Sequence, residues 1–361
     1  MNTFANLIGQ EPIKRQLSFY LSAAKKTGVM PFLMFNGQKG IGKTEFARQL
    51  AKANGRRFIE INSSTIKNET QFFEQVMLPM INDQDVTVFF DEAHELPKKL
   101  VATFLTVFNT EKSHIKEFSF RDMEFTFDFS RQHYMFATSE LDKLFPPFKD
   151  RLTVVDFNPY TPAETKQIIK ARIPDVQFKG GVLDDIVTTV RGNARSAVKR
   201  AKEIEMFCEA KNSPEFSKQE WEDLRHKVSI NKNGLTNTEL QVLRALRDRG
   251  PCTLTMLSAI TGMSRTALQR DVEIHLLKSN YMRIEGTRQI TGQGLTFLES
   301  AWQINKGEYN IPWLRSSSVL LIGILVGLIM KPCQKALNYS LANITQNFLL
   351  MNCLKKLRTI V

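Results

Sequence analysis

The sequence predicts an α/β fold: a parallel sheet with flanking helices, followed by a small helical lid domain and a C-terminal winged helix. The first half of the chain alternates short apolar runs with helical patterns, which is typical of parallel strands joined by helices. A capping box then opens a helical stretch, and three helical patterns followed by two short strands come last. At roughly 150 residues per domain, the 361 residues allow two or three domains. We expect domains over 1–157, 158–230 and 234–300, and a tail over 301–361.

The predicted strands of the first domain are apolar, and helical stretches separate most of them. They are expected over 32–35, 57–61, 86–90, 134–138 and 153–157. A helix is predicted from Lys43 to about residue 54, closed by Gly55. Phenylalanines alternate with mostly polar residues over 117–129, which instead predicts a projecting β-hairpin.

The second and third domains have clear boundaries in the sequence. Thr161-Pro162-Ala163-Glu164 is a capping box with proline at the first helical position, and helical patterns continue to about residue 227. We therefore expect the second domain to be entirely helical. A polar linker over 229–234 precedes the winged-helix pattern. Its predicted elements are helices over 238–249, 253–260 and 264–277, and strands over 281–284 and 288–290.

The composition excludes several classes of protein. With 42% hydrophobic and 24% charged residues, the chain is neither wholly disordered nor a multi-span membrane protein. Its four cysteines lack CxxC or Cys/His spacing, which argues against a disulfide scaffold or a zinc ribbon. The mixed, polar first ten residues do not have the pattern of a secretory signal, so we expect a cytoplasmic protein. Half of the net charge of +12 lies beyond residue 308, and the remainder is a mild bias that permits a nucleic-acid partner.

The segment from Gly37 to Thr44 matches the P-loop pattern G-x-x-x-x-G-K-[ST]. It follows a predicted strand and opens a predicted helix, which is the context that distinguishes a P-loop from a chance glycine-rich turn. Its glycines, Gly37, Gly40 and Gly42, allow backbone N–H groups to surround phosphate oxygens. We expect Lys43 to hold the β- and γ-phosphates of ATP and the Thr44 hydroxyl to ligate Mg²⁺.

An apolar strand ending in Asp91 and Glu92 begins about fifty residues after the P-loop. Asp91 is expected to hold Mg²⁺ through water, and Glu92 to polarise the attacking water as a general base. An exposed acidic pair at a strand end is the alternative that the pattern alone leaves open. The letters from Asp91 to His94 spell a helicase "DEAH" box, but the arginine-rich element of that superfamily does not follow.

Four further residues could sense or stabilise phosphate charge. Thr138 and Ser139 end a buried strand, Arg151 precedes another strand, and Arg195 opens a helix of the second domain. Hydrogen bonds or cationic contacts from such positions could stabilise the transferring phosphate. By spacing alone, an ordinary polar strand end is nearly as good an interpretation of Thr138-Ser139, and solvated side chains are the better interpretation of the two arginines.

Taken together, these motifs resemble the AAA+ ATPases, and more closely the RuvB family of bacterial Holliday-junction branch-migration motors. The resemblance covers about residues 4–298. The matching segments are Leu7-Ile8-Gly9-Gln10, the P-loop, Phe89-Phe90-Asp91-Glu92-Ala93-His94-Glu95-Leu96, Ala137-Thr138-Ser139, Gly192-Asn193-Ala194-Arg195, and the wing from Arg283 to Thr291.

The resemblance implies a role for each matching position. Ile8 would contact adenine, and Ser139, slightly favoured over Thr138, would be the first sensor. Arg151 would be an arginine finger that reaches a neighbouring subunit's nucleotide, and Arg195 would contact the γ-phosphate within its own subunit. The wing arginines, Arg283 and Arg288, would contact DNA phosphates without reading sequence.

The resemblance also implies partners. The protein would form a homo-oligomer, a hexamer in this family, on double-stranded DNA at Holliday junctions, and the hairpin near 112–129 would bind a RuvA-like protein. This chain differs from the family pattern at Gln38-Lys39, where the family has Pro-Pro, at Gly286, where the wing has an arginine, and throughout the hairpin.

The tail has no counterpart in that family. Residues 319–330 are a run of twelve apolar or glycine residues, and three serines before them extend the uncharged stretch to fifteen between Arg315 and Lys331. A membrane-spanning helix needs about 20 apolar residues. A short span, a helix buried in the protein or at a membrane interface, and a disordered extension all remain open, so contact of the tail with a membrane is undecided.

These observations favour one function and leave two alternatives. The first is an ATP hydrolase, a DNA helicase or translocase of the AAA+ class that drives branch migration in recombination and repair. The second is a nucleotide-switched DNA-binding or clamp-loader-like factor without motor activity. The third is a tail-anchored regulator at a membrane.

Overall fold

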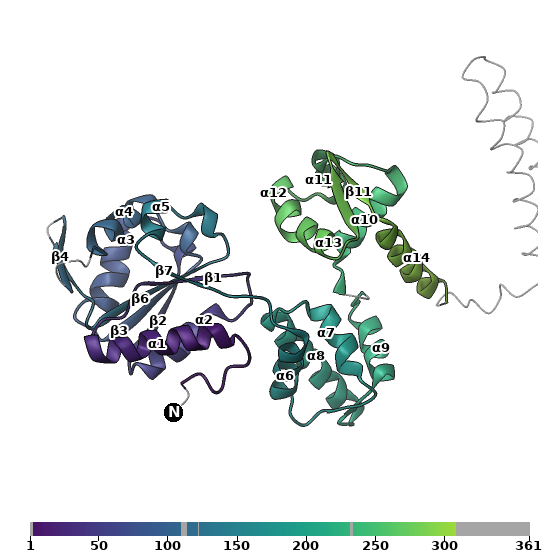
Figure 1. The fold of residues 1–361 in the computed structure, drawn as a ribbon, viewed down its shortest axis with the longest axis horizontal. Coiled ribbons are helices and arrows are strands. Elements are labelled where there is room, and N and C mark those ends of the chain that lie inside the picture. The colour runs from purple at the N-terminus through teal and green to yellow at the C-terminus, as the bar shows by residue number, and fades with distance from the viewer. Residues whose placement is uncertain (1–2, 110–113, 122, 232–233, 308–361) are drawn as a thin grey trace, which may run out of the picture. The chain divides into compact units, whose positions relative to one another are not determined.

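The computed structural model describes residues 3–109, 114–121, 123–231 and 234–307 (Figure 1). The chain forms two compact units, one ending at Asn237 and the other beginning at Thr238. The predicted tail lies, from residue 308 onward, outside the described residues. Among the helices that are described, none is both long and apolar enough to cross a membrane.

The first unit is built on a parallel sheet of five strands in the order β2-β3-β6-β1-β7. All five predicted strands are present, with ends that differ from the prediction by one or two residues. Their bounds are β1 Leu33–Asn36, β2 Arg57–Asn62, β3 Val86–Asp91, β6 Gln132–Thr138 and β7 Thr153–Asp156.

Both faces of this sheet are covered, because alternate residues of its central strands pack into two different cores. On β3, Phe89 packs with helices α1 (Glu11–Thr27) and α2 (Lys43–Ala53), whereas Val88 and Phe90 pack on the other face. Figure 1 shows α1 and α2 on one side of the sheet and α3, α4 and α5 on the other. The elements of these layers are α1 Glu11–Thr27, α2 Lys43–Ala53, η1 Ser63–Thr65, α3 Glu69–Phe72, the π-helical segment η2 Phe73–Ile81, η3 Ala93–Glu95, α4 Lys98–Val107, η4 Leu141–Lys143 and α5 Pro146–Lys149.

The predicted hairpin is formed by the antiparallel strands β4 (Ile115–Phe120) and β5 (Met123–Asp128). One of its faces is anchored rather than free, since the ring of Phe73 in η2 lies 4.7 Å from the rings of both Phe120 and Phe125. An ion pair of 3.2 Å between Arg121 and Glu74 ties the turn to the same segment. The alternation of phenylalanines therefore reflects a packed inner face.

The lid helices follow the sheet and have a core of their own. They are α6 Pro162–Arg172, α7 Val182–Val190, α8 Ala194–Lys211 and α9 Lys218–Lys227. The capping box predicted at Thr161 is present at the start of α6. The expectation of an entirely helical domain is wrong in one respect: β8 (Gln177–Phe178) and β9 (Glu215–Phe216) form a short parallel pair that brings the segments before α7 and α9 together.

The second unit has the predicted winged-helix order of three helical segments and a two-stranded wing. These elements are α10 Asn237–Arg249, α11 Leu254–Thr261, a third helix in three parts (α12 Arg265–Ala267, η6 Leu268–Glu273 and α13 Ile274–Lys278), β10 Met282–Glu285 and β11 Thr287–Ile290. Gly286 joins the two strands with φ +69°, which suits glycine. A further helix, α14 Gly292–Gly307, was not predicted and extends past the expected boundary at residue 300.

Candidate active site

The ends of three neighbouring strands bring the predicted site residues to one edge of the sheet. The P-loop follows β1, Asp91 ends β3, and Thr138 ends β6, which lies between those two strands. Because the carboxyl ends of parallel strands share one edge, segments far apart in sequence meet there. The N-terminus of α2, which begins at Lys43, faces the same edge, and a helix N-terminus favours anions.

The P-loop depends on glycine where it touches the lid helices. At Gly40, φ is +78°, and an added Cβ would lie 2.7 Å from Asn193 Oδ1 and 2.8 Å from Arg195 Cβ. The backbone N–H of Arg195 donates to the Gly40 carbonyl at 2.9 Å, and Asn193 Nδ2 donates to the Lys39 carbonyl at 2.6 Å. The start of α8 is thus fixed directly on the phosphate loop.

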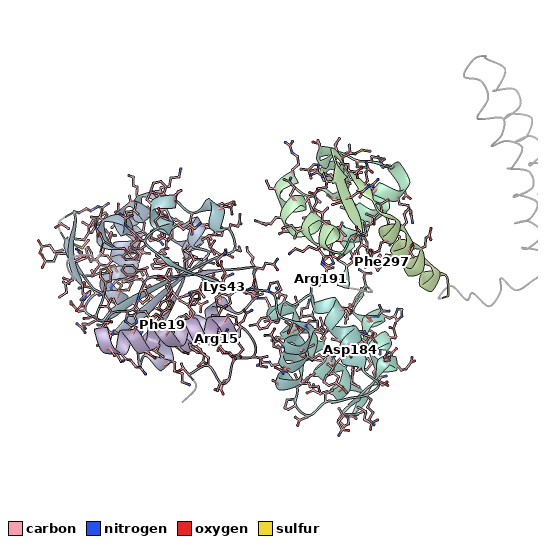
Figure 2. All side chains as sticks on the ribbon, viewed as in Figure 1. Arg15, Phe19, Lys43, Asp184, Arg191 and Phe297 are labelled. Carbon is pink, nitrogen blue, oxygen red and sulfur yellow. The ribbon has the colours of Figure 1, made fainter. Side chains whose placement is uncertain are left out.

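Lys43, near the end of the P-loop, is buried against the backbone of the same loop. Its Nζ donates to the carbonyl oxygens of Gly37, at 2.6 Å, and Gln38, at 3.1 Å. Burial lowers the pKa of Lys43, and the nearby Asp91 and Glu92 act in the opposite direction. An ammonium group that has exchanged water for two carbonyls is ready to exchange them for phosphate oxygens. Figure 2 shows Lys43 at the edge of the sheet region.

The two acids at the end of β3 have different surroundings. Asp91 Oδ1 accepts the backbone N–H of Glu92 at 3.0 Å. Glu92 lies in the left-handed region, with φ +52°, which turns its side chain out of the strand direction. Its Oε2 accepts the hydroxyl of Ser139 at 3.3 Å, and its Oε1 lies 3.3 Å from Lys39 Nζ.

His94 links the acids to the end of β6 and was not predicted as a site residue. Its Nδ1 lies 2.9 Å from the Thr138 hydroxyl and 3.5 Å from Glu92 Oε2. The same hydroxyl accepts the backbone N–H of Glu140 at 3.0 Å, and Thr138 is fully buried. Thr138 therefore holds His94, whereas Ser139 touches Glu92 directly. The only sign of His94 in the sequence was its place in the "DEAH" string. No spacing rule relates that histidine to Thr138, so its role could not be predicted.

A pocket of about 640 Å³ brings most of these groups together, and sites for small ligands commonly have this volume. The predicted residues that line it are Ile8, Gly40, Gly42, Lys43, Thr44, Asp91, Glu92 and Arg195. Lys39 and Tyr160, which were not predicted, also line it. Burial raises the pKa of Tyr160 to about 12, so its hydroxyl stays protonated beside Gly42.

Four of the residues predicted for the nucleotide site lie outside the lining of this pocket. Gly37 precedes it, and Thr138 and Ser139 act behind the acids, as described above. Arg151 is exposed after α5, where its Nη1 donates to the Pro147 carbonyl at 2.8 Å. An arginine in this position cannot be counted among the groups that contact a ligand in the pocket of its own chain.

The oxygen atoms of the pocket fit Mg²⁺ bound together with phosphates. The Thr44 hydroxyl and the Asp91 carboxylate line one pocket, and hard oxygen ligands are those that Mg²⁺ prefers. Within the described parts of the chain, no cluster of three or more His, Cys, Asp or Glu side chains could hold a metal ion. Mg²⁺ typically needs only one or two protein groups when phosphates and water complete its shell.

The two predicted DNA-contacting arginines of the wing differ in their surroundings. The Arg283 side chain is 57% exposed and contacts Gln289, at 3.0 Å, and Glu285, at 3.3 Å. The Arg288 side chain is 12% exposed and forms a two-pronged pair with Glu273 of η6, at 2.7 and 3.2 Å. Arg288 thus joins the wing to the third helix of its own unit.

Comparison with sequence families finds two matches in this chain. Residues 33–160 match the family "ATPase family associated with various cellular activities (AAA)", and residues 232–299 match the "RuvB C-terminal winged helix domain". The first match contains the P-loop and the acids of β3, and the second contains the wing. Each match thus lies in a different one of the two compact units for most of its length.

Similar proteins extend over most of the chain. The Holliday junction branch migration complex subunit RuvB of Mycoplasmopsis synoviae is 25% identical over 314 residues, which are 82% of this chain and 96% of that protein. The corresponding subunit of Mycoplasma genitalium is 25% identical over 308 residues, with the same shares. Among solved structures, the Thermotoga maritima RuvB Holliday junction branch migration motor has a TM-score of 0.69 at 21% identity, covering 83% of this chain and 97% of its own.

Proposed function

Because this chain combines an AAA ATPase domain with a RuvB-type winged helix domain, we propose that it is an ATP-driven motor that moves double-stranded DNA at Holliday junctions. The relatives named as branch migration subunits support this reading over most of the chain. The winged helix of the RuvB type favours a motor over a clamp-loader-like factor, which would share the nucleotide residues alone.

One observation carries the proposal: a single pocket holds the P-loop, both acids of β3 and an arginine of the lid helices. The groups that would bind the phosphates, hold Mg²⁺ and activate water are therefore present at one place. Lys43 binds the β- and γ-phosphates once it releases the carbonyls of Gly37 and Gln38. Arg195 contacts the γ-phosphate from the lid, and Ile8 lies against adenine.

Glu92 is the general base of the proposed reaction. Its carboxylate accepts a proton from the water that attacks the γ-phosphate, and Ser139 and His94 fix the direction of that carboxylate. Thr44 and Asp91 would hold Mg²⁺, which neutralises charge on the phosphate oxygens when bound. Thr138 acts through His94 and is a positioning residue.

Arg151 serves the pocket of a neighbouring copy. Because it lies outside the pocket of its own chain, it can stabilise phosphate charge only across a subunit contact. This supports a homo-oligomer, and a hexameric ring is the assembly we propose. ATP would then connect the lid helices, the P-loop and a second subunit, so that hydrolysis changes their contacts together.

The winged helix supplies the proposed DNA contact, and Arg283 is its exposed wing arginine. Contacts of this kind to phosphates hold DNA without reading its sequence, as a translocating protein requires. The hairpin of β4 and β5 is the proposed docking element for a RuvA-like protein.

Three single variants test the nucleotide mechanism. Lys43→Ala is expected to abolish ATP binding and hydrolysis, whereas Arg151→Ala is expected to abolish hydrolysis while ATP still binds. Lys149→Ala removes an exposed cation two residues away and is the matched control, expected to keep wild-type turnover. Normal hydrolysis by Arg151→Ala would refute the intersubunit mechanism.

A junction assay tests the motor itself. Wild-type protein with ATP and Mg²⁺ is expected to dissociate a synthetic four-way junction into duplexes by moving its strands. Glu92→Gln is expected to bind the junction without dissociating it. Persistent DNA binding with no ATP-dependent strand movement would favour the nucleotide-switched alternative instead.

A further inference from the structure

We infer that Lys39 is a γ-phosphate ligand, and that its ion pair with Glu92 is the position that this side chain takes before ATP binds. The inference rests on the proposed function, because it assumes that the pocket binds ATP and that Glu92 is the base. It assigns a second P-loop lysine to the triphosphate, in addition to Lys43.

The position of Lys39 allows it to reach both groups. It immediately precedes Gly40, and it lines the same pocket as Lys43 and Glu92. Its Nζ lies 3.3 Å from Glu92 Oε1, although Glu92 is more than fifty residues away in the sequence. Its backbone carbonyl is held by Asn193, so the loop stays fixed while the side chain turns.

The side chain of Lys39 is free to change partners. It is 61% exposed, whereas the side chain of Glu92 is 22% exposed, so packing does not hold the lysine in place. An ion pair with one exposed partner contributes little to stability. A triphosphate carries several negative charges in the same pocket and attracts an ammonium group more strongly than one carboxylate does.

The exchange of partners would make room at Glu92 for the attacking water. While Lys39 is paired with Oε1, its ammonium group occupies a place beside that oxygen where a water molecule could bind. When Lys39 leaves Oε1, Glu92 keeps its contacts with Ser139 and His94 through Oε2, so its orientation is preserved. Binding of the γ-phosphate would therefore release the base at the moment when a substrate is present, and ADP, which lacks that phosphate, would not.

Nucleotide binding to the full chain provides the first test. Dissociation constants are measured for the slowly hydrolysed analogue ATPγS and for ADP, with wild type, Lys39→Met, Lys39→Arg and the control Lys52→Met, an exposed lysine of α2. Lys39→Met is expected to raise the dissociation constant of ATPγS by about tenfold and that of ADP by no more than about twofold. Lys39→Arg is expected to retain most of the preference for ATPγS over ADP, and Lys52→Met is expected to retain the whole of that preference.

A double-mutant cycle with Glu92→Gln tests the exchange of partners. Glu92→Gln removes the carboxylate that competes for Lys39, so the affinity for ATPγS is expected to rise by about threefold. This gain in affinity should disappear when Lys39→Met is also present. Equal weakening of ATPγS and ADP by Lys39→Met, or a gain from Glu92→Gln that persists without Lys39, would overturn the inference while leaving the proposed function intact. A wild-type chain that binds neither nucleotide would overturn both.

Discussion

Arg283 and Arg288 are five residues apart in the wing, but their surroundings differ. Arg283 is exposed, whereas Arg288 is paired with Glu273 between β11 and η6. Removing one member of a buried pair leaves an uncompensated charge and commonly costs about 3–5 kcal/mol. We propose that Arg288 positions the wing and that Arg283 contacts DNA phosphate.

The salt dependence of duplex binding separates these roles. Arg283→Ala is expected to reduce the slope of log K against log salt by about 0.9, the contribution of one phosphate contact. The double variant Glu273→Met/Arg288→Met leaves no unpaired charge and is expected to keep the wild-type slope. A slope that falls by the same amount in the double variant would identify Arg288 as a phosphate ligand after all.

His133 gives the sheet a specific sensitivity to acid. It lies buried on β6 with 2% of its surface exposed, and its Nδ1 lies 3.1 Å from Asn54 Nδ2. Burial, and then the charge of Arg56, lower the pKa of His133 to about 3. The unfolded chain binds a proton below its ordinary pKa of about 6.5, whereas the folded chain does not until about 3.

Stability is therefore expected to fall as the pH drops below about 6.5. The slope from this residue is about 1.4 kcal/mol per pH unit, or about 2 kcal/mol lost at about pH 5. His133→Gln should remove that part of the loss, measured as the difference in urea-unfolding free energy between neutral and acidic buffer. An unchanged acid loss in this variant would show that His133 is protonated in the folded protein.

At the scale of elements, Asn193 has two separate tasks at the start of α8. Its Oδ1 accepts the backbone N–H of Ser196 at 3.0 Å as an N-cap, and its Nδ2 donates to the Lys39 carbonyl. Serine caps helices about as well as asparagine but carries no amide donor. One substitution can therefore separate the two tasks.

Asn193→Ser is expected to keep α8 stable, weaken ATP binding several-fold and speed hydrogen exchange in the P-loop. Asn193→Ala should show the same effects and also lose about 1 kcal/mol of stability with the cap. Thermal unfolding, nucleotide titration and hydrogen exchange measured on both variants provide the check. P-loop exchange at the wild-type rate in Asn193→Ser would mean that the amide does not hold the loop.

The elements that could be predicted are those that local patterns define. The five strands, the P-loop helix, the capping box at Thr161 and the wing each have a signal within a few neighbouring residues. Helices α1 and α14 were not predicted. The contacts around the site could not be predicted either, because Asn193 and Lys39 are 154 positions apart and no local rule relates them. The sequence shows that Arg288 is charged, but it does not show that Arg288 pairs with Glu273.

For the whole molecule, mixing two inactive variants tests whether subunits share a site. Arg151→Ala keeps its pocket and Lys43→Ala keeps its arginine, so a mixed assembly contains some complete interfaces. With equal amounts and random order, roughly a quarter of interfaces are complete, and ATPase activity is expected to recover to about that fraction. The matched control mixes Lys43→Ala with the double variant Lys43→Ala/Arg151→Ala, which cannot form a complete interface. No recovery in the first mixture would place Arg151 in its own chain's reaction.

Glu92 holds a backbone conformation that glycine or asparagine adopts more readily, at a cost of about 1–2 kcal/mol for an ordinary residue. A search for thermostable variants that ranks substitutions by folding alone would therefore select Glu92→Gly. Under the proposed mechanism, such a variant would be more stable but inactive, because it lacks the carboxylate of the proposed general base. At this position we therefore expect folding stability and the proposed catalytic role to favour different residues.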